Sequence, residues 1–318
     1  MGKGPLTSEQ ITFFKDAGFL LLKDMLNPRL CERAIDRLWR TLPPSSRMKR
    51  EDPSTHFGPF PPDEESDDPL HIRRGYLWQL RECGTEPLLI GLAYNAKMRA
   101  VAEQLLGKGM LVAPTVNGRP MGSTGTAWPG GPADPAITEG IRGIYCTRPI
   151  EDAISQARHH DQPCHTDGHP FQLGAVGLLT DTPPNGGAFR VWPGSHQRLY
   201  PTFQLQYDQL RVPYYDHLPS SKGIVHGPAY LAEIKRVAAD IQPVHCHGER
   251  GDVVIWHHRL AHSATANRSN VLRQAVLYDF SRTDLDQCRR DPPQPDMWRD
   301  WSEEVRNTDC GNSARQHH

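Results

Sequence analysis

The hydrophobic pattern of this chain changes character about one third of the way along. Before residue 110, apolar side chains recur every three or four positions, which is typical of amphipathic helices. Thr7 and Gln10 form a capping-box pattern, and Gly18 ends the first periodic stretch. Asn27 and Pro28 then introduce a second one. The pattern predicts helices over 7–18, 28–42 and 87–106, with a short apolar run at 19–22.

Beyond residue 110, short apolar runs alternate with turns rich in Gly, Pro and Asn, a rhythm typical of a β-sandwich or jelly roll. No internal repeat or linker divides the chain, so we expect a single, mainly β domain over 1–318. Its expected parts are a helical N-terminal part (1–109), a jelly-roll core (about 110–285) and a C-terminal tail (286–318). The predicted strands are 140–147, 172–180, 188–192, 244–246, 253–257 and 271–280, with a further helix over 230–239.

Two segments follow neither pattern. Residues 43–69 combine many prolines with an acidic run at 63–68 and few apolar side chains, which predicts an irregular surface loop. The alternative for 43–80 is a lid over a cavity, which the sequence alone does not support further. Residues 118–136 are too rich in Gly and Pro for either a helix or a strand.

Charge and cysteine content narrow the possible partners. The chain has 36 basic and 37 acidic residues, which gives no sign of a nucleic-acid or anionic membrane partner. No apolar run approaches the roughly 20 residues that span a bilayer, and no hydrophobic signal region precedes Thr7. We therefore expect a cytoplasmic protein. The seven cysteines are scattered and form no C-x-x-C pair, which argues against a disulfide framework or a zinc ribbon.

The first candidate chemistry is an H-x-D motif at His165 and Asp167. Residues two apart on a strand point the same way and lie about 6.6 Å apart, so both side chains could reach one ion. Two imidazoles and one carboxylate on one face of a metal are the ligands of non-haem Fe(II) oxygenases. A second H-x-D motif, His159 and Asp161, lies in a polar segment, whereas only the first leads into a glycine turn and an apolar strand.

The third ligand would come from 251–279, where three histidines compete. His257 and His258 fall on alternate faces of an apolar strand, so each could simply be packed in the sheet. His262 lies at the corner before the next strand and is the favoured ligand. Arg273 follows eleven positions later among apolar neighbours. It is either a surface residue in a salt bridge or an inward guanidinium that needs an anion, such as a dicarboxylate cosubstrate.

Taken together, these motifs resemble the phytanoyl-CoA dioxygenase (PhyH) family of Fe(II)/2-oxoglutarate-dependent oxygenases. The resemblance runs in order along nearly the whole chain, except for 43–80 and 110–140. The segments that carry it are LTSEQITFFKDAGFLLLKDML, EPLLIGLAYNAKMRAVAEQLLG, HTDG, NGGAFRVWPGSH and GDVVIWHHRLAHSATANRSNVLRQAVLYDF.

The resemblance implies a double-stranded β-helix, a cupin-like jelly roll flanked by helices. By motif, His165 and Asp167 match the proximal metal ligands, His262 the distal ligand, and Arg273 the residue that holds the far carboxylate of 2-oxoglutarate. The near carboxylate is expected to contact the strand at 144–148. The implied cofactors are Fe(II), 2-oxoglutarate and O₂. The implied reaction is oxidation of an unactivated C–H bond of a small organic metabolite, with release of succinate and CO₂.

Some positions depart from the family pattern. Many members have serine two residues after the distal histidine, where this chain has Ala264, with Ser263 one place earlier. Gly174 and Gly177 are small where larger residues are common, which would enlarge the pocket. Related halogenases lack the carboxylate ligand so that chloride can bind, so Asp167 favours hydroxylation, desaturation or another chloride-free oxidation.

Two other functions fit the same residues. One is a metal-binding jelly roll without redox chemistry, and the other is an iron dioxygenase that does not use 2-oxoglutarate, in which Arg273 would lack a role. A CoA ester would need a basic patch for its phosphates, and the sequence has no concentrated one. A small metabolite or a natural-product intermediate is therefore the preferred substrate.

Overall fold

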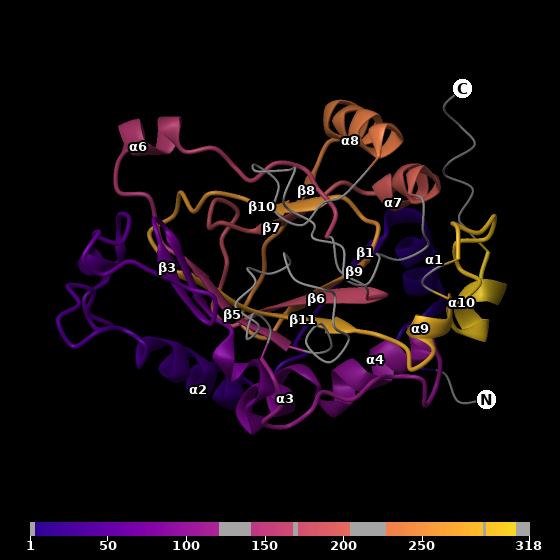
Figure 1. The fold of residues 1–318 in the computed structure, drawn as a ribbon, viewed down its shortest axis with the longest axis horizontal. Helices are drawn as coiled ribbons and strands as arrows, with labels where there is room; N and C mark the ends of the chain where they lie inside the picture. Colours follow the sequence, from indigo (N-terminus) through magenta and orange to yellow (C-terminus); the bar gives the residue numbers. More distant parts are fainter. Residues whose placement is uncertain (1–3, 121–140, 168–170, 204–226, 289–290, 310–318) are drawn as a thin grey trace.

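The computed structural model describes residues 4–120, 141–167, 171–203, 227–288 and 291–309. Two antiparallel sheets lie one above the other, and helices of the N-terminal third cover the outside of the larger sheet (Figure 1). This arrangement confirms the predicted jelly-roll fold with a helical N-terminal third. The larger sheet has the order β1 (Phe19–Leu22), β9 (Val253–His257), β6 (Leu173–Leu178), β11 (Arg273–Phe280), β5 (Ile141–Thr147), β4 (Leu77–Leu80), β3 (His71–Arg74) and β2 (Ser66–Asp68). The smaller sheet has the order β10 (His262–Ala264), β7 (Phe189–Val191) and β8 (Val244–Cys246).

The N-terminal helices form largely where the sequence predicts them. Thr7 and Gln10 exchange the reciprocal hydrogen bonds of a capping box, and Gly18 ends the first helix with a left-handed φ of 84°. The predicted helix over 87–106 is two helices, because the Asn95 side chain accepts a hydrogen bond from the Met98 amide and starts a new one. The helices are α1 (Ser8–Ala17), α2 (Pro28–Trp39), α3 (Pro87–Ala93), α4 (Ala96–Leu106), α6 (Ala153–Arg158), α7 (Ser195–Leu199), α8 (Pro228–Asp240), α9 (Leu285–Cys288) and α10 (Glu303–Asn307). Short 3₁₀ turns occupy Pro53–His56, Glu82–Thr85 and Tyr200–Thr202.

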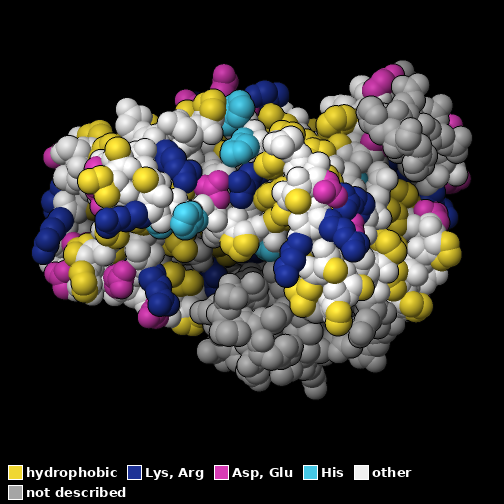
Figure 2. All heavy atoms as spheres, turned by 90° about the horizontal axis from the view of Figure 1, so that it is seen from above, with side chains coloured by type: hydrophobic (Ala, Val, Ile, Leu, Met, Phe, Trp, Pro, Cys, Tyr) yellow, Lys and Arg dark blue, Asp and Glu magenta, His cyan; other side chains and the backbone are white. Residues whose placement is uncertain are grey.

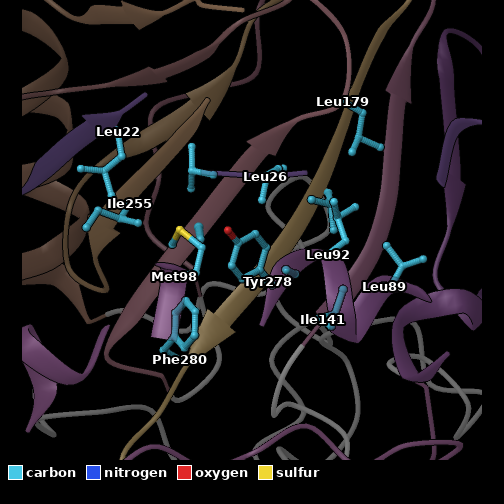
Figure 3. Packing of buried hydrophobic residues seen from close by; sticks show 14 of the residues in the cluster. Leu22, Leu26, Leu89, Leu92, Met98, Ile141, Leu179, Ile255, Tyr278 and Phe280 are labelled. Carbon is cyan, nitrogen blue, oxygen red and sulfur yellow. The ribbon is translucent and has the colours of Figure 1, made fainter. Parts of the chain in front are cut away.

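Strand β11 shows why the sheet has two different faces. Val276, Tyr278 and Phe280 point to the core that the large sheet shares with α1 to α4. Figure 3 shows the last two of these side chains among apolar groups of that core. Ala275 and Leu277, which alternate with them, face the smaller sheet. The space between the two sheets is therefore separate from the helical core, and this is where a site can form.

The prediction of an irregular loop over 43–69 is wrong at its C-terminal end. Residues 66–68 form β2, which pairs with β3 and so extends the large sheet. Glu64, in the acidic run, is only 4% exposed. Its carboxylate accepts hydrogen bonds from the Ser46 hydroxyl at 2.6 Å and the Arg47 amide at 3.0 Å. A run of acidic residues suggests solvation, but this carboxylate is buried because local donors satisfy it.

Three further expectations have different outcomes. The segment 118–136 lies almost entirely outside the described residues. The six cysteines in the described part are all free thiols, as the scattered spacing predicts. Among the described helices, none is long and apolar enough to cross a membrane.

A bulge in β5 determines which of its side chains face the space between the sheets. The pairing of β5 with β11 shifts its register at Arg142, the extra residue. The next residue, Gly143, has φ +115°, and a Cβ there would lie 2.1 Å from the carbonyl oxygen of Leu80. Because a bulge re-aims side chains, Arg142 and Tyr145 line the same cavity although they are three positions apart.

Gly143→Ala should therefore destabilise the protein by about 2–4 kcal/mol, from backbone strain and the clash with β4. Urea unfolding would measure this loss. Gly91→Ala is the matched control, since Gly91 is an exposed helical residue with nothing within 4 Å of an added Cβ. The control should be stabilised by about 0.5–1 kcal/mol. Equal stability of the two variants would show that the bulge does not require glycine.

Candidate metal centre

His165, Asp167 and His262 come together between the two sheets. The nitrogen or oxygen atoms that each could offer to a metal all lie within 4.8 Å of one another. Nε2 of His262 is 3.5 Å from Oδ1 of Asp167. The two histidines face each other across an antiparallel bridge, in which each amide donates to the other's carbonyl at 3.1 and 2.8 Å. The backbone therefore fixes the distance between two of the three groups.

The hydrogen bonds of the two imidazoles leave one ring nitrogen of each available. Nδ1 of His165 is 2.8 Å from the Pro163 carbonyl oxygen, and Nδ1 of His262 is 2.9 Å from that of Leu260. A carbonyl only accepts hydrogen bonds, so Nδ1 carries the proton and Nε2 keeps its lone pair. Desolvation and the neighbouring His262 lower the pKa of His165 to about 4, which keeps this imidazole neutral near pH 7. Both rings are thus prepared to bind a cation.

The competing histidines and the second H-x-D motif are engaged in packing contacts and ion pairs away from the three possible ligands. His257 is buried and stacks on Trp301 with ring centroids 5.2 Å apart, and His258 packs against Phe171. Asp161 forms ion pairs with Arg190 at 2.9 Å and Arg268 at 3.0 Å. Only His165, Asp167 and His262 form a group with metal-ligand spacing among the described residues.

Sequence analysis missed two charged residues behind Asp167. Arg142 Nη2 donates to Asp167 Oδ2 at 2.9 Å and to Asp279 Oδ1 at 2.6 Å, and its Nε donates to Asp279 Oδ2 at 2.8 Å. Arg142 and Asp279 are each 4% exposed. Burial by itself would lower the pKa of Arg142, but the two carboxylates outweigh it and raise this pKa above its usual value. Because Oδ2 of Asp167 is engaged by Arg142, Oδ1 is the oxygen that faces the histidines.

Arg142→Met should lower the affinity for Fe(II) by about 10- to 100-fold, because Asp167 would lose the donor that orients it. It should also destabilise the protein by about 3–5 kcal/mol, because Asp279 would remain as a buried charge without its cation. Metal titration and urea unfolding measure the two effects separately. The double variant Arg142→Met with Asp279→Leu should recover most of the stability and not the affinity. Recovery of both would mean that Arg142 does not position the ligand.

Arg273 lies in the same cavity as the three possible ligands, and the cavity has a volume of about 230 Å³. The side chain is 4% exposed, and its Nε has no hydrogen-bond partner. Within the described part of the chain, no carboxylate forms an ion pair with it. Burial lowers the pKa of Arg273 to about 10, so the guanidinium remains charged near pH 7. A buried cation of this kind requires an anion from outside the chain.

The two strand glycines do not enlarge the cavity as expected. A Cβ on Gly174 would lie 2.3 Å from the Trp256 ring, so that ring already fills the space. Gly177 faces the helical side, where a Cβ would lie 2.6 Å from Leu26 Cδ1. Trp256 also packs against His262, with ring centroids 5.3 Å apart. The small residues accommodate close packing rather than a larger substrate.

Comparisons with known proteins agree with this geometry. Residues 141–275, which contain the three possible ligands and Arg273, match the model of the phytanoyl-CoA dioxygenase (PhyH) family. This region is a PhyH domain. The PhyH family consists of iron- and 2-oxoglutarate-dependent oxygenases, so the chain is an enzyme of that class and uses those cofactors. No curated protein matches the chain.

Solved structures resemble the PhyH domain and its helical flank. EctD from S. alaskensis with bound Fe is 16% identical, with a TM-score of 0.51 over 92% of this chain and 82% of EctD. EctD with 2-oxoglutarate and 5-hydroxyectoine is 17% identical, with a TM-score of 0.50 over 92% and 81%. The carbocyclase SnoK from nogalamycin biosynthesis is 16% identical, with a TM-score of 0.48 over 93% and 98%. At these identities, the likeness to EctD supports the fold.

Proposed function

We propose that this protein oxidises a C–H bond of a small organic molecule, with Fe(II) held by His165, Asp167 and His262 and 2-oxoglutarate held at its far carboxylate by Arg273. One observation carries the proposal: the three possible ligands and a buried cation without an anionic partner line one cavity. Iron held by these residues would supply the chemistry by which 2-oxoglutarate and O₂ are converted to succinate and CO₂, with one oxygen atom of O₂ in succinate and the other in the oxidised substrate or in water.

The residues present fit this cofactor set. Two imidazoles and one carboxylate would hold the metal and would leave positions for 2-oxoglutarate and O₂. Arg142 engages one oxygen of Asp167, which favours a single bond from the other oxygen to the metal. Arg273 supplies a planar pair of donors, which match a carboxylate better than a point charge does. Trp256 excludes water from one side of His262.

The near carboxylate of 2-oxoglutarate has several possible partners in the cavity. Ser263 and Ala264 both line the cavity, but Oγ of Ser263 accepts a hydrogen bond from Arg190 Nε at 3.0 Å. On the expected strand, Tyr145 and Thr147 also line the cavity. We propose that the near carboxylate of 2-oxoglutarate binds the metal and lies against the side of β5 that carries Tyr145 and Thr147.

A compact metabolite or natural-product intermediate is the substrate class that we favour over a CoA ester. The cavity of about 230 Å³ is small for a ligand with a nucleotide. On the face shown in Figure 2, Lys and Arg side chains are interspersed with acidic and hydrophobic groups and do not gather in one patch. A CoA phosphate group would be expected to require such a patch.

Anaerobic addition of Fe(II) and then 2-oxoglutarate tests the proposal. A 2-oxoglutarate oxygenase should give a weak visible charge-transfer band that needs both additions. A metal-binding jelly roll without redox chemistry would bind Fe(II) and give no band. Admission of O₂ with a metabolite library should then release succinate for the correct substrate. An iron dioxygenase that does not use 2-oxoglutarate would consume O₂ without forming succinate.

A further inference from the structure

A third buried arginine, Arg81, lines the cavity beside Arg142 and Arg273. Arg81 follows β4 directly and is 7% exposed. Its Nη2 donates to Oε1 of Gln79 at 3.1 Å, and its Nε is buried without a hydrogen-bond partner. The guanidinium carbon lies 5.9 Å from the centre of the Tyr145 ring. In the described part of the chain, no carboxylate lies within ion-pair distance of Arg81.

Of the three arginines in the cavity, only Arg142 and Arg273 have a negatively charged partner, either in the protein or in the proposed 2-oxoglutarate. Arg142 is compensated by Asp279 and Asp167. Arg273 is assigned to the far carboxylate of 2-oxoglutarate, and the near carboxylate belongs at the metal. Arg81 remains, and an unpaired buried guanidinium is costly. The charge that compensates it must then come from another molecule in the cavity.

The sheet register separates the two arginines. Arg273 and Leu77 are both paired with Thr147, so these two residues lie at the same level of the sheet. Arg81 lies four residues farther along the chain than Leu77, which corresponds to about 13 Å in an extended strand. One carboxylate group therefore does not reach both guanidinium groups.

We propose that Arg81, together with Gln79, binds a carboxylate of the primary substrate. This inference rests on the proposed function, because it takes the metal and Arg273 as the sites of 2-oxoglutarate. The guanidinium fork matches a carboxylate, and Gln79 holds one side of that fork in place. A single cation in a small cavity suits a monoanion better than a phosphate dianion. The enzyme would thus oxidise a small carboxylic acid.

Paired acids and amides test this assignment. The probes are hexanoate, cyclohexanecarboxylate, benzoate and phenylacetate, each compared with its primary amide. Calorimetry measures their binding to the protein loaded anaerobically with Fe(II) and 2-oxoglutarate. At least one acid should bind about 10-fold or more tightly than its amide. Arg81→Met should remove that preference, and Arg81→Lys should keep part of it.

The controls separate this inference from the proposed function. Arg74→Met removes an exposed arginine on the neighbouring strand and should leave the acid preference unchanged. The dissociation constant of 2-oxoglutarate, followed by the charge-transfer band, should stay within about twofold in Arg81→Met, whereas a tenfold change would assign Arg81 to the cosubstrate. The inference is also wrong if no acid binds more tightly than its amide, or if the preference survives Arg81→Met. Absence of the band in the unaltered protein would instead overturn the proposed function.

Discussion

Asp167→Ala should abolish succinate formation and lower the affinity for Fe(II) by more than about 100-fold. Loss of a residue that only orients a ligand typically costs 10- to 100-fold, so loss of the ligand itself should cost more. Asp167 is the carboxylate of the group, and its Oδ1 faces Nε2 of His262 at 3.5 Å. The fold should persist, because Asp279 still compensates Arg142. Metal analysis after anaerobic dialysis and the charge-transfer band measure the two losses.

The second H-x-D motif supplies the matched control. Asp161→Ala removes a carboxylate from the same sequence pattern, but this carboxylate pairs with Arg190 and Arg268. The control should lose some stability and retain its affinity for Fe(II). Succinate release by Asp167→Ala at the rate of the unaltered protein would remove Asp167 from the metal centre. Equal loss of Fe(II) in both variants would point to a general effect on folding.

The sequence predicts the group of His165, Asp167 and His262, our proposed metal ligands, because each lies at a local feature that pattern analysis detects. His165 and Asp167 stand two apart in the sequence just before a glycine, and His262 begins β10 after the end of β9. The strands at 253–257 and 271–280 are also predictable, because their apolar residues mark them as buried strands whichever strands they pair with. The fold class and these strands of the core can therefore be predicted from local sequence patterns.

The residues that surround the ligands are not predictable in this way. Arg142 faces the cavity because it is the extra residue of a bulge, next to Gly143, that shifts the register of β5 against β11. Arg81 faces it because β4, which follows a proline-rich and acidic segment, pairs with β5. Both effects depend on pairing between distant parts of the chain, which no window of sequence contains. The break at Asn95 is a smaller case, because asparagine fits both a helix surface and an N-cap.

Arg273→Met should weaken binding of 2-oxoglutarate at least about 30-fold. Removing one partner of a buried, hydrogen-bonded charge pair costs 2 kcal/mol or more, and about 1.4 kcal/mol corresponds to a tenfold change. The same variant should be at least as stable as the unaltered protein when 2-oxoglutarate is absent, because it no longer buries a cation without a partner. Titration of the charge-transfer band gives the affinity, and thermal unfolding without cosubstrate gives the stability.

These two effects have opposite signs, and this is what separates a binding residue from a structural one. A guanidinium that held the sheet together would, on removal, lower the unfolding temperature with and without 2-oxoglutarate. Arg273→Lys should fall between the two, because lysine keeps the charge but not the planar pair of donors. In the unaltered protein, 2-oxoglutarate should raise the unfolding temperature, and in Arg273→Met most of that rise should be lost at the same concentration. If Arg273→Met keeps the full rise, the far carboxylate binds elsewhere, and Arg81 becomes the first alternative because its Nε is also buried without a partner.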